Sequence, residues 1–180
     1  MMRFVEYDCV PLQGELVYRA YEHSFDFKVK SSSDLTEGIG NKGTTSLLIG
    51  TLQIEVGIEV GAALFVWGLH SHFSQWRRDH LSAVPAKRGG IRVLFDEEPT
   101  IGISQGLADV GEWHTAFDPN TGWICISSNQ SDSAERYIEF AENTIAGVSN
   151  EKLVSVRLHP TWYQERFLEE PASLFSKLEA

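Results

Sequence analysis

The chain has 180 residues, 42% hydrophobic and 11% aromatic, which is enough apolar surface for a packed core and excludes a disordered chain. This length suits one globular domain spanning residues 1–180, without a disulfide or metal to hold it together. The net charge of −10 argues against nucleic-acid binding and favours solubility or a basic protein partner.

The sequence also predicts where the protein resides. Cys9 and Cys125 are the only cysteines and have no CxxC partner, so we expect free thiols. The first ten residues include Glu6 and Asp8 and lack the apolar stretch of a secretory signal. The longest uncharged stretch, 60–76, is too short and too polar to span a bilayer. We therefore expect a cytoplasmic protein with no membrane association.

Two strands are predicted near the start of the chain, at 15–21 and 25–30. In the second, apolar and charged residues alternate, which is the pattern of a half-buried strand. The segment 31–43 follows and reads SSSDLTEGIGNKG. Because it is polar and rich in Ser and Gly, we expect a mobile loop there.

The clearest strand pattern covers residues 52–59. Four aliphatic side chains alternate with polar ones, which places Glu55 and Glu59 together on the opposite face. A second strand at 63–69 is expected to complete a hairpin, and a further short strand is expected at 91–95.

Another hairpin is predicted from 113–117 and 123–126. In the joining segment Asp118 can cap the turn, Pro119 presets a type I turn, and Gly122 can adopt a positive φ.

An amphipathic helix is predicted over 133–146. Asp132 and Glu135 have the spacing of a capping box, and Gly147 stands where a helix would end. The residues between them form an apolar stripe at helical spacing: Ala134, Tyr137, Ile138, Ala141 and Ile145.

The rest of the chain adds a strand at 153–158 and a short C-terminal helix at 171–178, with Pro171 at its first position. Together these elements indicate an α+β fold: a mainly antiparallel twisted sheet with the 133–146 helix packed on it. The alternative is a β-sandwich or barrel with an appended helix.

The histidines suggest a metal site. His70 and His72 lie two residues apart on a predicted strand, so both imidazoles would face the same side, as a divalent metal requires. Asp79 or His80 could supply a third ligand, although Arg77 and Arg78 nearby would repel a cation. The alternative is that these histidines simply form hydrogen bonds at a strand end. No other cofactor is expected.

Basic residues gather between 77 and 92 in this acidic chain. The segment could bind a phosphate or carboxylate through Arg77, Arg78, Lys87 and Arg88. The alternative is that these side chains pair with the acidic residues at 96–98.

No catalytic or nucleotide-binding motif occurs, so the sequence favours a non-catalytic interaction protein, such as an acidic inhibitor or immunity-type protein that caps a basic partner. Glu55 and Glu59 would face that partner, with Trp76 and Trp162 as exposed anchors. The alternative is a metal- or small-ligand-binding protein, or an enzyme, that uses His70, His72 and the basic residues of 77–92. A carbohydrate module using the two tryptophans is a third class.

Overall fold

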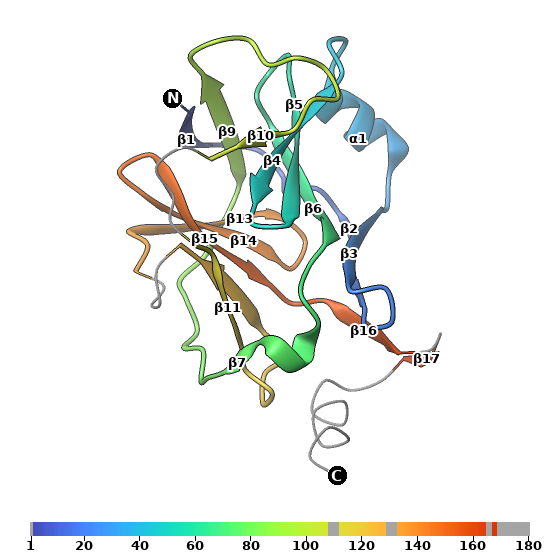
Figure 1. The fold of residues 1–180 in the computed structure, drawn as a ribbon. Helices are drawn as coiled ribbons and strands as arrows, with labels where there is room; N and C mark the ends of the chain where they lie inside the picture. The colour runs from blue at the N-terminus through green and yellow to red at the C-terminus, as the bar shows by residue number, and fades with distance from the viewer. Residues whose placement is uncertain (1, 108–111, 129–132, 165–166, 169–180) are drawn as a thin grey trace.

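The computed structural model describes residues 2–107, 112–128, 133–164 and 167–168. Strands make up most of this part, arranged in two large sheets and one small one (Figure 1). The described residues include one α-helix, α1 (Ser32–Ile39), and one turn of 3-10 helix, η1 (Phe73–Gln75). Neither helix is long and apolar enough to cross a membrane.

The larger sheet has eight strands, and most neighbours in it are antiparallel. Their order across the sheet is β10 (Gln105–Gly106), β4 (Thr44–Ile49), β5 (Leu52–Gly57), β6 (Ala63–Leu69), β3 (Ser24–Val29), β2 (Gly14–Arg19), β16 (Thr161–Gln164) and β17 (Phe167–Leu168). The pairs β10–β4 and β16–β2 are parallel.

The second sheet has seven strands. Their order is β7 (Arg77–Arg78), β11 (His114–Phe117), β12 (Ile124–Ser127), β15 (Lys152–Leu158), β14 (Thr144–Ser149), β13 (Arg136–Ala141) and β8 (Lys87–Arg88). The two-residue strands β7 and β8 therefore lie at opposite edges, each parallel to its neighbour. A separate antiparallel pair joins β1 (Met2–Tyr7) to β9 (Gly90–Phe95).

Both large sheets contribute to one hydrophobic core. Its buried residues include Val66 and Leu52 from the eight-stranded sheet, and Phe117 and Val156 from the seven-stranded sheet. Only residues 159–160 separate β15 from β16, so the chain passes directly from one sheet to the other. The core therefore lies between two sheets that a two-residue segment of the chain connects.

The two predicted hairpins are confirmed. β5 pairs with β6, and the aliphatic residues at alternate positions of β5 are at most 2% exposed. β11 pairs with β12 through the predicted turn. There the Asp118 carboxylate accepts the Asn120 backbone N–H at 2.9 Å, and Gly122 has a φ of 80°.

The prediction of a helix over 133–146 is wrong. The segment contains β13 and β14, which form an antiparallel hairpin with a bend at Asn143, where φ is 58°. Ile138 and Phe140 are both buried, which is the two-residue period of a strand. Gly147 lies within β14, where a Cβ would collide with the Ser155 side chain. This glycine permits close packing and does not end a helix.

The prediction of a loop over 31–43 is also wrong, because this segment contains α1. The Ser31 hydroxyl accepts the Asp34 backbone N–H at the start of the helix, and the helix ends at Gly40, where φ is 70°. No residue of α1 is buried, so the sequence had no apolar stripe to indicate a helix.

The described part of the chain is thus mostly β with one α-helix, which agrees with an α+β class only in part. The prediction of a single antiparallel sheet with a helix packed on it is wrong, because two large sheets enclose the core and both include parallel strand pairs. Neither described sheet closes into a barrel. The helix predicted at 171–178 lies outside the described residues.

Candidate functional site

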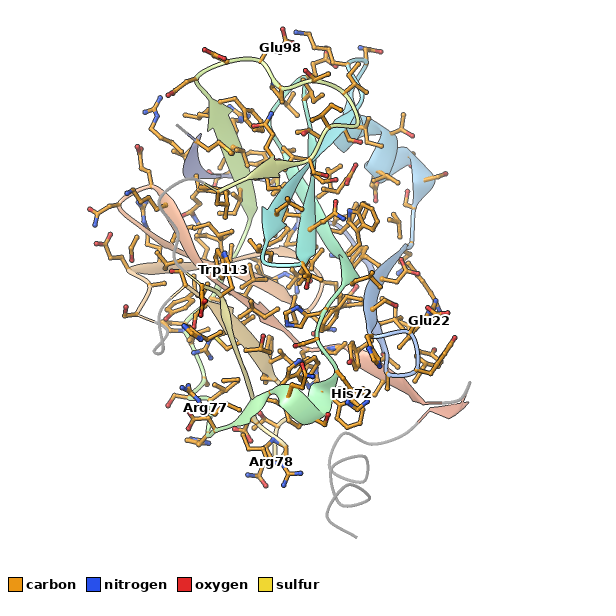
Figure 2. All side chains as sticks on the ribbon, in the orientation of Figure 1. Glu22, His72, Arg77, Arg78, Glu98 and Trp113 are labelled. Carbon is orange, nitrogen blue, oxygen red and sulfur yellow. The ribbon has the colours of Figure 1, made fainter. Side chains whose placement is uncertain are left out.

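A cleft of about 710 Å³ opens where the two large sheets meet, and we call it the His70 cleft. The eight-stranded sheet contributes the β4–β5 turn, with Thr51, and the residues that follow β6. The seven-stranded sheet contributes its edge strand β7 and the start of β11. Figure 2 labels Trp113 and Arg77, which line the cleft on this second side.

His70 connects the two walls of the cleft. Its Nε2 atom lies 2.7 Å from the Thr115 hydroxyl on β11, and its Nδ1 atom lies 3.5 Å from the Thr51 hydroxyl. Burial lowers the pKa of His70 to about 4, so the imidazole is neutral at pH 7. A neutral imidazole has one N–H donor and one acceptor nitrogen, which allows it to bind both hydroxyls.

Trp76 forms the base of the cleft. Its indole Nε1 donates to both the carbonyl and the hydroxyl oxygen of Ser71, at 3.1 and 3.0 Å. Its rings pack 5.1 Å from Tyr18 and 5.9 Å from Trp162, measured between ring centroids. The aromatic core therefore fixes the position of this side chain.

The burial of Trp76 and Trp162 contradicts the sequence interpretation. Their exposed fractions are 4% and 2%, so the expectation that both lie at the surface is wrong. Neither side chain therefore presents an exposed ring as the sequence interpretation assumed. Trp67, by contrast, is 36% exposed.

Arg77 on β7 gives the cleft a positively charged side chain. Arg77 lines the cleft, and one guanidinium nitrogen of Arg77 lies 3.1 Å from the Asp79 carboxylate. His114 and the half-buried Trp113 line the same side, at the start of β11. No carboxylate is present among the described residues that line the cleft.

The three histidines considered as metal ligands have different neighbours. His70 binds the two threonines, whereas the His72 ring lies 2.6 Å from the Ser74 hydroxyl and 4.8 Å from the His23 ring centroid. Burial, and then the nearby His23, lower the pKa of His72. His80 points elsewhere, to Asp118. In the described part of the chain, no group of three His, Cys, Asp or Glu side chains is placed to hold a metal ion.

His80 belongs to the turn around Asp118. Its Nδ1 lies 3.2 Å from the Asp118 carboxylate, which is fully inaccessible to solvent by surface area. Burial raises the pKa of Asp118, but backbone N–H donors from Leu81 and Asn120 and the contact with His80 outweigh it, so the pKa is lowered. The contact between His80 and Asp118 therefore links the loop after β7 to the β11–β12 turn.

The predicted anion-binding residues are divided between two edges of one sheet. Arg77 and Arg78 form β7 and lie low in Figure 2, whereas Lys87 and Arg88 form β8 at the opposite edge. Lys87 pairs with Glu6, and Arg88 lies 3.6 Å from Glu139. The alternative prediction, that these side chains pair with the acidic residues at 96–98, is therefore not met by either of them. Of the four, only Arg77 lines the His70 cleft.

Glu55 and Glu59 do not form a common face either. Glu55 accepts hydrogen bonds from the Ser46 hydroxyl at 2.8 Å and from the Trp67 indole at 2.9 Å. Glu59 follows the end of β5, and its carboxylate accepts the Asn41 backbone N–H.

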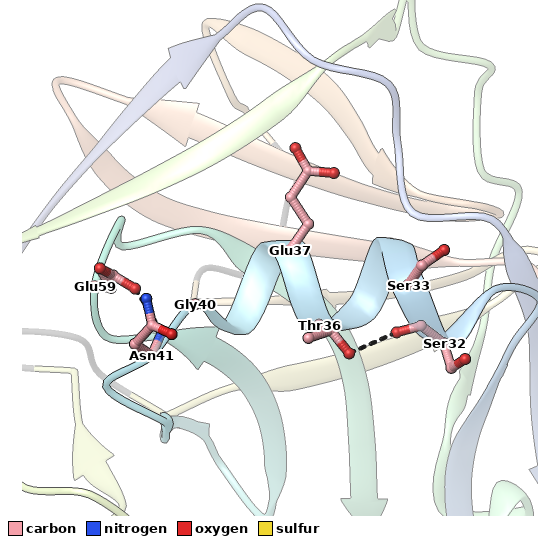
Figure 3. Close-up of a pocket in the computed structure, with 7 residues that line it drawn as sticks. All are labelled: Ser32, Ser33, Thr36, Glu37, Gly40, Asn41 and Glu59. Atoms are coloured by element: carbon pink, nitrogen blue, oxygen red, sulfur yellow. Dashed lines mark hydrogen bonds between the residues drawn. The ribbon is translucent and has the colours of Figure 1, made fainter.

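Glu59 lines a second concavity, which we call the α1 hollow (Figure 3). It has a volume of about 640 Å³, and polar residues of α1 and the segment after it, such as Thr36 and Glu37, form most of its wall. The Thr36 hydroxyl donates to the Ser32 carbonyl within the helix.

The sequence interpretation missed most residues of the His70 cleft, including Thr51, Trp113 and Thr115. The only available signal was Trp113-His114-Thr115 at the start of a predicted hairpin strand, which is not specific. No model of a known protein family matches the chain, and the search of characterised proteins also finds no match.

Proposed function

We propose that the chain is a binding protein that holds a small molecule in the His70 cleft. The observation that supports this is the convergence of a half-buried, neutral imidazole and two tryptophans at one concavity between two sheets. Small-molecule sites in proteins are clefts of about 300 to 1,000 Å³ with aromatic walls and a few fixed polar groups. The His70 cleft falls within this range of volumes, and two tryptophans lie among its polar lining residues.

The acidic-inhibitor hypothesis has weaker support. Its two aromatic anchors, Trp76 and Trp162, are core residues, and its two glutamates are held by different neighbours. The net charge of −10 remains compatible with a basic partner, but it identifies no surface for one. The small-ligand hypothesis at His70 and Arg77 is therefore the one that the geometry favours.

The test uses four molecules that share an indole ring and differ in charge: indole, indole-3-acetamide, tryptamine and indole-3-acetate. We expect at least one of them to raise the melting temperature of the protein, because a ligand that binds only the folded state stabilises it. A Thr51→Trp variant, which fills the cleft rim, should lose this stabilisation. Val10→Trp is the control, because Val10 is 80% exposed and lies outside the cleft lining.

Two results would contradict the proposal. One is that none of the four molecules changes the melting temperature. The other is that Thr51→Trp is stabilised as strongly as Val10→Trp, since binding would then occur elsewhere.

A further inference from the structure

We propose that the ligand of the His70 cleft is a planar ring that carries an oxyanion, with Arg77 binding the anionic group and Trp113 packing on the ring. This inference rests on the proposed function and adds the chemical class of the ligand. It follows from the charge distribution around the cleft, the protonation of His70 and the composition of the walls.

The cleft differs in charge from the rest of the molecule. The chain carries 25 acidic and 15 basic residues, yet the described residues that line the cleft include Arg77 and no carboxylate. Among the described lining residues a cationic ligand would find no carboxylate, and the nearby Asp79 carboxylate is already paired with the guanidinium of Arg77. An anion would be attracted, so the site discriminates by the sign of the ligand's charge.

Arg77 is the source of this charge, because His70 is not. The pKa of His70 is about 4, so its ring contributes hydrogen bonds and no charge at pH 7. A guanidinium is always charged and has five N–H donors in one plane, which match the two oxygens of a carboxylate or phosphate.

Asp79 is part of the same arrangement. Its carboxylate lies 3.1 Å from a guanidinium nitrogen of Arg77, and both side chains are about half exposed. The contact offsets part of the positive charge. An incoming oxyanion therefore shares the guanidinium with Asp79, and removing the Asp79 charge should strengthen binding.

The walls indicate the rest of the ligand. Trp113 is half-buried beside the cleft, and the indole of Trp76 is fixed at its base by hydrogen bonds to Ser71. Tryptophan surfaces favour planar rings, which stack on them. The hydroxyl groups of Thr51 and Thr115 already contact His70 and can also reach polar atoms at the edge of such a ring.

Isothermal titration calorimetry tests the ligand class with two matched pairs. Indole-3-acetate is compared with indole-3-acetamide, and adenosine monophosphate with adenosine, so each pair differs mainly in the anionic group. We expect at least one anion to bind about tenfold or more tightly than its neutral partner, because charge-assisted hydrogen bonds are the stronger ones. The pair that shows the difference distinguishes a carboxylate ligand from a phosphate ligand.

Three variants assign the effect to Arg77. Arg77→Gln should reduce the affinity for the anion to that for the neutral partner, whereas Asp79→Asn should raise it about threefold or more. Arg78→Gln is the matched control, because it removes the same charge from the same strand at a residue outside the cleft lining. A merely structural role for Arg77 would not produce the gain in Asp79→Asn.

The outcomes separate this inference from the proposed function. If indole-3-acetamide and adenosine bind as tightly as the anions, the ligand class is wrong and the binding function stands. If Arg78→Gln weakens anion binding as much as Arg77→Gln, the role of Arg77 is wrong. If none of these four molecules binds, this inference fails, and the proposed function fails with it if indole and tryptamine also do not bind.

Discussion

The His70 cleft and the α1 hollow have similar volumes, about 710 and 640 Å³, but they are built differently. The hollow is formed largely by one short helix, which buries no residue, and by the segment that follows it. The cleft is formed by four chain segments from two sheets, and its base belongs to the aromatic core.

This difference shows why volume alone does not identify a binding site. Exposed polar side chains, such as Thr36 and Glu37, lose rotational freedom when they bind a ligand, which opposes binding. Trp76 and His70 are already held by the fold, so little of that cost remains. The following substitutions test this contrast, beginning with the largest expected effect.

Trp76→Ala should destabilise the protein by about 3 to 5 kcal/mol, because it removes a large buried side chain and leaves a cavity in the aromatic core. Trp67→Ala is the matched control, since Trp67 is 36% exposed and outside the cleft lining, and it should cost about 1 kcal/mol. Urea unfolding followed by circular dichroism measures both. Equal losses would mean that Trp76 is not a core residue.

Lowering the pH should reduce the free energy of unfolding, because His70 is held in its neutral form in the folded protein. Its pKa is about 4 when folded and 6.5 in its ordinary state, so the unfolded chain takes up a proton first as the pH falls. Its contribution to stability is complete above pH 6.5 and is lost between pH 6.5 and 4, by about 3 kcal/mol.

The matched variant is His70→Gln, which keeps hydrogen-bonding groups but does not titrate. Between pH 7 and pH 4 the unfolding free energy of the variant should fall by about 3 kcal/mol less than that of the wild type. Urea titrations at the two pH values measure this difference. The same pH dependence in both proteins would show that His70 is not buried in its neutral form.

Charges in the α1 hollow should matter least. Glu37→Gln and Glu59→Gln should each change the unfolding free energy by less than about 0.5 kcal/mol, because the side chains are at the surface and Gln keeps an acceptor for the Asn41 N–H. Neither should alter ligand affinity in the cleft by calorimetry. A loss of ligand binding in either variant would place the site in the hollow and reverse the comparison.

The sequence predicted strands well where a two-residue period was bounded by a clear turn. The 52–59 pattern and the turn at Asp118 are examples, because alternating burial and turn chemistry are both local properties. The helix over 133–146 failed because Ala134, Tyr137 and Ile138 fit a helical stripe as well as a strand. The structure instead follows the two-residue period of a strand, in which Ile138 and Phe140 are buried, and the turn lies at Asn143.

The candidate site could be predicted only in part. His70 and Arg77 were recognised by residue type, and both line the cleft. Thr115, the hydrogen-bond partner of His70, lies on β11, and Trp113 directly precedes that strand, which sheet pairing brings beside β7. Side-chain burial of Trp76 depends on the same long-range packing, and for that reason its neighbouring arginines wrongly suggested an exposed position.

The two-residue passage from β15 to β16 also constrains motion. The two sheets also share one hydrophobic core, so separating them would expose buried apolar surface. Entry of a guest molecule should then require only rotation of rim side chains, such as Arg77. Association would be fast, and selection among guests would depend on shape complementarity to a nearly rigid receptor.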